Sequence, residues 1–87
     1  MRYRSPDSQK NEYLGVVVES LGARRMRVLC EDNNIRICSI PKNHAVPFIH
    51  KDSCVIVKAW DVQSDTKGRI VYRYNREQSN RLRGLLL

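Results

Sequence analysis

Arginine residues gather in two neighbouring segments of this 87-residue chain. Arg25 and Arg27 alternate with apolar residues in RRMRVLC (24–30), and Arg36 stands between two isoleucines in IRI (35–37). Such alternation is typical of β-strands, where like charges that face each other repel. Because guanidinium groups bind phosphate oxygens in bidentate fashion, we expect this face to meet a phosphate-bearing partner. The alternative is a basic face that water alone solvates.

The charge of the whole chain also favours a polyanionic partner. Sixteen Lys and Arg against nine Asp and Glu give a net charge of +7, in a chain that is 41% apolar. Such a domain favours RNA, DNA or an anionic membrane, although the charge could serve solubility alone. No apolar run reaches the roughly 20 residues of a transmembrane helix, and the first residues, MRYRSPDSQKNEY, lack the apolar stretch of a signal peptide. We therefore expect a soluble, intracellular chain without a membrane partner.

Two thiols and two imidazoles could hold zinc, and they belong to Cys38, His44, His50 and Cys54. Structural zinc sites usually contain a close pair such as CxxC, and the sequence has no such pair. Cys30 is the third cysteine, so one thiol remains over whichever pair forms, which fits a reducing compartment. We expect the cysteines to serve as small apolar residues, and we expect no metal site.

Residues for catalysis form no familiar motif. The acidic side chains fall in segments typical of turns, where solvation explains them: Glu31, Asp32, Asp52, Asp61 and Asp65. The sequence lacks GxSxG, HExxH and a Gly-rich phosphate loop, and it contains four glycines in all. We therefore expect no catalytic residues, no cofactor and no enzymatic activity.

The hydropathy pattern indicates five short strands and one helix. β-Branched and alternating residues predict strands at 13–20, 24–30, 35–40, 53–61 and 69–74, with a polar turn at 31–34. Gly15 suggests a bulge or bend in the first strand. Asn75 and Gln78 form a capping box for a terminal helix that Gly84 ends. The pattern predicts an all-β chain with a short C-terminal helix, in which five strands form an OB-fold barrel. An SH3-like barrel is the alternative, because strand number does not fix connectivity.

Three regions follow from these elements. Residues 1–12 are polar and show neither helical nor strand period, so we expect a mobile basic arm. Residues 13–74 form the barrel, and residues 75–87 form the helix and an apolar tail of three leucines.

The alternation also assigns residues to faces of the barrel. It places Met26 and Val28 in the interior and places Arg25, Arg27 and Arg36 on the outer face of the hairpin. Phe48 and Trp60 could stack on bases, but a lone tryptophan in a small barrel is more often part of the core, so we expect Trp60 to lie there.

Several pieces of the sequence occur together in one known family. LGVV (14–17), LGA (21–23) and RVLCED (27–32) are followed by RIC (36–38), IP (40–41), VKAWD (57–61), KG (67–68) and RY (73–74). In this order and spacing they resemble the archaeal translation initiation factor 1A family. The resemblance covers about residues 13–83.

The resemblance implies both a fold and a function. The family is similar to the S1-like OB-folds, and its members contact ribosomal RNA at the decoding (A) site of the small ribosomal subunit. They act with other initiation factors, including a translational GTPase, and support initiator tRNA recruitment and start-codon selection. This implies a cytoplasmic, monomeric RNA-binding protein that meets the initiator tRNA complex indirectly.

The RNA-binding residues implied combine the arginines with the loop that follows them. By position, Arg25 and Arg36 match basic residues of the family, and Phe48 matches an aromatic one. Where the family has several Lys and Arg, the loop 42–47 has Lys42 as its one permanent cation. The residues expected to contact RNA are Arg25, Arg27, Arg36, Lys42, His44, Phe48 and Lys51.

Two other functions are compatible with the sequence. A general single-stranded nucleic-acid binder of cold-shock type would display several aromatic residues on the second and third strands, and this chain has none there. A protein–protein adaptor would use the basic face for an acidic partner and the leucines 85–87 for a groove.

Overall fold

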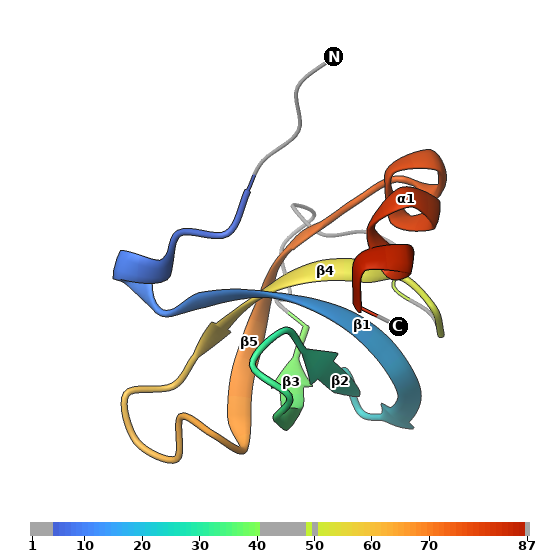
Figure 1. Cartoon of the computed structure of the whole chain (residues 1–87). Coiled ribbons are helices and arrows are strands. Elements are labelled where there is room, and N and C mark those ends of the chain that lie inside the picture. Colours follow the sequence, from blue (N-terminus) through green and yellow to red (C-terminus); the bar gives the residue numbers. More distant parts are fainter. Residues whose placement is uncertain (1–4, 41–48, 50, 87) are drawn as a thin grey trace.

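A computed structural model describes residues 5–40, 49 and 51–86 of the chain (Figure 1). A short 3-10 helix, η1 (Ser8–Lys10), precedes the first strand. The strands are β1 (Glu12–Gly22), β2 (Arg25–Cys30), β3 (Ile35–Ser39), β4 (Cys54–Ala59) and β5 (Lys67–Arg73). The helix α1 (Arg76–Leu86) follows them. These bounds agree with the elements expected from the sequence to within a few residues.

The strands close into a barrel in the order β1-β2-β3-β5-β4. Strand β1 pairs with both β2 and β4 in antiparallel fashion, while β3 and β5 pair in parallel over a short stretch. Closure leaves no long strand edge exposed for pairing with another chain. The five-stranded barrel with one C-terminal helix confirms the predicted OB-fold class.

Two apolar clusters hold the fold together. The barrel interior contains buried side chains from all five strands: Val17, Met26, Val28, Cys30, Cys38, Val55, Val57 and Ile70. The second cluster lies between α1 and the outside of the barrel, and its members are Leu14, Val16, Cys54, Ile56, Tyr74 and Leu82. Strands β1 and β4 contribute to both clusters, so they are buried on both faces where the helix covers them (Figure 1).

The pairing of strand β1 with β2 is irregular, but the irregularities do not lie at Gly15. The register shifts of its pairing with β2 lie between Val17 and Glu19 and between Ser20 and Gly22. Gly15 instead permits a close approach, because a Cβ there would lie 2.6 Å from Cγ1 of Val28. The prediction of a bulge at Gly15 was therefore wrong, and close packing of two strands explains the glycine.

The chain enters and leaves the barrel through capped helices. In η1, the Asp7 side chain accepts a hydrogen bond from the Gln9 amide, so residues 8–10 form a turn within the segment expected to be an arm. At α1, the Asn75 amide donates to Gln78 Oε1 and the Gln78 amide donates to Asn75 Oδ1, at 3.0 and 2.8 Å. These two bonds confirm the capping box, although the helix continues past Gly84 to Leu86.

Candidate nucleic-acid interface

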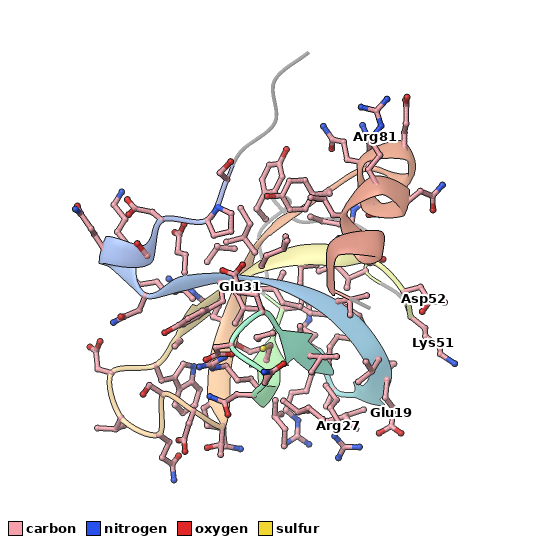
Figure 2. All side chains as sticks on the ribbon, in the orientation of Figure 1. Glu19, Arg27, Glu31, Lys51, Asp52 and Arg81 are labelled. Atoms are coloured by element: carbon pink, nitrogen blue, oxygen red, sulfur yellow. The ribbon has the colours of Figure 1, made fainter. Side chains whose placement is uncertain are left out.

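Arg25 and Arg27 project from β2 to the outside of the barrel, as expected. Their neighbours Met26 and Val28 are buried in the interior. Arg25 is exposed, while Arg27 Nη1 donates a 2.6 Å hydrogen bond to Glu19 Oε1 of β1. Figure 2 shows this pair together at one end of the barrel. Both side chains are about half exposed, so the pair restrains Arg27 only weakly.

Arg36 lies inside the barrel, and its predicted placement on the outer face was wrong. The hairpin register pairs Arg36 with Val28 and Cys38 with Met26, so Arg36 shares the interior face. Its side chain is 2% exposed, whereas the neighbouring Ile35 is 52% exposed. The two isoleucines suggested the opposite phase for β3, but pairing with β2 fixes which face each residue occupies.

Every nitrogen of the Arg36 guanidinium has a partner. Nη1 and Nη2 donate to the two carboxylate oxygens of Asp32 at 2.9 and 2.7 Å, and Nε donates to the carbonyl oxygen of Ser64. The guanidinium carbon also lies 4.5 Å from the centre of the Tyr13 ring. These contacts compensate a buried cation, and a side chain that is 2% exposed is shielded from a phosphate of a partner.

The ion pair shifts the pKa values of both partners. Hydrogen bonds from Arg36 lower the pKa of the Asp32 carboxyl below its ordinary value of 3.8. The same bonds to Asp32 raise the pKa of the Arg36 guanidinium. Both groups are therefore held in their charged forms.

Cations from three strands share the outer face of the barrel instead. Arg25 pairs with Ser39 on β3, and Ser39 pairs with Arg69 on β5. Arg69 pairs in turn with Lys58 on β4. Directly paired residues lie on one face, and neighbouring strands are about 4.8 Å apart, so these side chains form a row across four strands.

A second row runs beside the first. Arg27 pairs with Ile37, and Ile37 pairs with Lys67. The glycine between Lys67 and Arg69, Gly68, is buried against β4, so Lys67 and Arg69 themselves point outward. We call these five cations the basic face: Arg25, Arg27, Lys58, Lys67 and Arg69.

Three members of the basic face were not among the expected RNA-binding residues. Lys58 and Arg69 alternate with the interior residues Val57 and Ile70, so the sequence pattern does indicate that they point outward. The sequence pattern does not show that β3 and β5 are neighbours in the sheet, because a long connection separates them in the chain. Without that knowledge, Lys58, Lys67 and Arg69 belong to no recognisable group.

Trp60 is 44% exposed, so the expectation that it lies in the core was wrong. It follows the last residue of β4, and Val62, two residues on, is 71% exposed. A tryptophan at this position can present its ring to a partner.

The remaining expected RNA-binding residues lie in or beside the β3–β4 connection. Lys51 is exposed in the turn before β4 and points away from the barrel in Figure 2. Lys42, His44 and Phe48 fall outside the described residues. The structure therefore places Arg25 and Arg27 together and Lys51 in a separate turn.

All three cysteines are buried as free thiols. Burial raises the pKa of Cys30 and raises that of Cys38 to about 12, so neither ionises near neutral pH. Among the residues that the structure describes, which exclude His44 and His50, no group of three His, Cys, Asp or Glu is placed to hold a metal ion. Within the same ranges, no helix is long and apolar enough to cross a membrane.

Comparison with known proteins points to one family. A family described as "Translation initiation factor 1A / IF-1" matches residues 1–85. Translation initiation factor 1A of Methanococcus maripaludis (strain C5) is 42% identical over 78 residues, which cover 88% of this chain and 76% of that protein. The factor of Thermococcus kodakarensis is 44% identical over 79 residues, which cover 90% and 68% of the two chains. The factor of Pyrococcus abyssi is 47% identical over 76 residues, which cover 86% and 67%. These relatives are initiation factors and not enzymes, which confirms the prediction that the chain is not an enzyme.

Proposed function

Because the chain belongs to the translation initiation factor 1A family and so acts in translation initiation, we propose that it binds ribosomal RNA at the decoding (A) site of the small ribosomal subunit. In this role it supports recruitment of the initiator tRNA and selection of the start codon. Its partners are other initiation factors, including a translational GTPase, with the initiator tRNA complex met indirectly. It acts as a monomer in the cytoplasm.

The observation that carries this proposal is the basic face. Its cations lie on adjacent strands, where mutual repulsion offers the fold no stability. No salt bridge joins Arg25, Lys58 or Arg69 to any residue in the described ranges. Phosphates of structured RNA would supply the missing anions. The sheet fixes the distances between these cations, so they are positioned before RNA binds.

Arg36 is not a member of the proposed contact. Its guanidinium is buried and each of its three nitrogens donates a hydrogen bond within the chain. We propose that it supports the RNA-binding surface by holding the β2–β3 turn, while Lys42, His44, Phe48 and Lys51 extend the contact beyond the basic face.

Co-sedimentation with purified archaeal small ribosomal subunits across a KCl series tests the proposal. Wild-type affinity should fall steeply with salt, because binding releases counterions from RNA. Arg25→Gln and Arg69→Gln should each weaken binding several-fold. Each should also reduce the slope of the logarithm of the binding constant against the logarithm of the KCl concentration by about one. The double variant should lose about two units of slope.

Arg81→Gln is the matched control, since it also removes one positive charge. Arg81 lies on α1, at the other end of the molecule from Arg27 in Figure 2, and its 3.7 Å contact with Glu77 is highly exposed. This variant should bind like the wild type. If all three single variants bind equally well, or if the wild type fails to sediment with subunits, the proposal is wrong.

A further inference from the structure

A groove opens at the end of the basic face, where β4 leads into the β4–β5 loop. It is an open groove with a volume of about 440 Å³, and it is lined by Lys58, Ala59, Trp60, Asp61, Val62 and Arg69. This volume lies within the range of sites that bind small molecules or single chemical groups. Two of its cations also belong to the row that crosses the barrel from Arg25.

An aromatic ring forms one part of the groove. Trp60 is the one tryptophan of the chain, and 44% of its surface is exposed although large aromatic side chains are mostly buried in small domains. Val62 beside it is 71% exposed. An exposed indole next to cations has the composition of sites on which nucleobases stack.

Two paired cations also line the groove. Lys58 and Arg69 are direct partners in the β4–β5 register, where like charges destabilise a sheet. Among the described residues neither has a salt bridge, and Asp61 is the one acidic residue that lines the groove. A phosphate between the two would offset their repulsion.

The loop that carries this site is held in place before any ligand arrives. The Ser64 carbonyl accepts from buried Arg36, and the Ile37 amide donates to the Thr66 carbonyl at 2.9 Å. Gln63, with φ of 54°, accepts hydrogen bonds at its carbonyl from the amides of Thr66 and Lys67. A loop fixed in this way loses little conformational freedom on binding.

We propose that the groove binds one unpaired nucleotide of RNA, with its base stacked on Trp60 and its phosphate between Lys58 and Arg69. This inference rests on the proposed function, and it adds the class of RNA that the site selects. Bases within a duplex are stacked on their neighbours and cannot reach an indole, so the site takes a single-stranded or flipped-out nucleotide.

Tryptophan fluorescence tests the inference directly, because the full-length chain reports from Trp60 alone. The probes are hexauridylate and a blunt RNA duplex with the same number of phosphates, at low salt. Hexauridylate should quench the emission saturably, and the duplex should not. Lys58→Gln and Arg69→Gln should each weaken hexauridylate binding by about five-fold or more, while Arg81→Gln should leave it unchanged.

Trp60→Leu supplies the second readout, using fluorescence polarisation of dye-labelled hexauridylate. Since Trp60 is half exposed, this variant keeps the barrel, and it should lose about five-fold or more in affinity. Unchanged affinity would refute stacking. Equal quenching by duplex RNA or by a polyglutamate peptide would also refute the inference, the latter in favour of an acidic protein partner.

The two proposals fail in different experiments. If wild type sediments with small subunits but Trp60→Leu binds hexauridylate as tightly as wild type, the groove inference is wrong and the proposed function stands. If the wild-type chain does not sediment with subunits but hexauridylate still quenches its Trp60 emission saturably, the decoding-site role is wrong and the nucleotide site stands.

Discussion

Arg36 gathers three separate parts of the chain around one buried guanidinium. Asp32 belongs to the β2–β3 turn, Ser64 to the β4–β5 loop and Tyr13 to β1. Burying such a cation is costly unless it is paired and hydrogen-bonded, and here the carboxylate, the carbonyl and the ring together compensate it. Removing one partner should therefore destabilise the chain more than removing an exposed charge.

We predict that Asp32→Asn lowers the free energy of unfolding by about 2 kcal/mol at pH 7, as measured by urea denaturation. The folded pKa of Asp32 is lowered, so its contribution is present above the unfolded value of 3.8 and is lost as pH falls through the folded pKa. Wild type should therefore lose more stability than Asp32→Asn between pH 5 and about pH 2.

Asp65→Asn is the control for this comparison. Asp65 is exposed in the β4–β5 loop, and no described residue forms a salt bridge with it. Its replacement should change stability by less than about 0.5 kcal/mol. If Asp32→Asn behaves the same way, the ion pair does not stabilise the fold.

At the scale of elements, the β1–β2 turn contains two non-glycine residues in a backbone conformation that they disfavour. Gly22, Ala23 and Arg24 have φ values of 75°, 51° and 58°. Glycine adopts positive φ without steric cost, whereas alanine and arginine do so at about 1 kcal/mol or more. The turn therefore holds strain at Ala23 that pairing of the flanking strands must offset.

Ala23→Gly should raise the free energy of unfolding by about 0.5–1 kcal/mol, because it relieves this strain. Gly22→Ala should have the opposite effect of about 1 kcal/mol, although no neighbouring atom lies within 4 Å of its new Cβ. Thermal unfolding monitored by circular dichroism measures both. Similar shifts of the same sign in the two variants would show that φ does not control the stability of this turn.

The sequence predicted the strands and helix well because those signals are local. β-Branched runs, the polar turn and the Asn75–Gln78 capping box each act within a few residues. The residues of β3 that face the interior were predicted wrongly, because the two isoleucines suggested that Arg36 points outward. The register with β2 places Arg36 on the interior face instead. A buried arginine is recognisable only when its partners, such as Ser64, are known.

At the scale of the molecule, the helix and the barrel are joined by shared packing on two strands. Leu82 of α1 is 8% exposed and packs in the cluster that includes Leu14 and Ile56. Strands β1 and β4 carry that cluster on one face and the barrel core on the other. The basic face depends on an intact sheet and makes no use of the helix, because its cations lie on β2, β4 and β5.

Leu82→Ala should lower the free energy of unfolding by about 2–3 kcal/mol through loss of apolar contacts. Urea unfolding followed by circular dichroism should still show one transition, because the same strands join the two clusters. Arg81→Gln, next to it on the exposed side, should change stability by less than about 0.5 kcal/mol. Two separate transitions in Leu82→Ala would show that the helix unfolds independently.

The candidate site was less predictable than the fold, because its residues come from strands that are far apart in the sequence. Arg25 was predicted from its own segment, but Lys58 and Arg69, which lie in the same row across the barrel, come from distant strands. Trp60 was assigned to the core because composition does not show where a strand leaves the barrel. Surfaces assembled across a closed barrel become visible only with its strand order.

The dual pairing of β1 has a consequence for how fast the chain folds. Gly15 pairs with Cys30 in the neighbouring strand and also with Val55, which lies far along the sequence. Ile37 likewise pairs with Lys67, which is synthesised much later. Each long-range pairing costs loop-closure entropy before its contacts add any stability. Barrels of this kind therefore fold in milliseconds to seconds and not in microseconds. Until β4 arrives, one edge of β1 is open to other strands, and the speed of closure sets how long a newly made chain is exposed to misassembly.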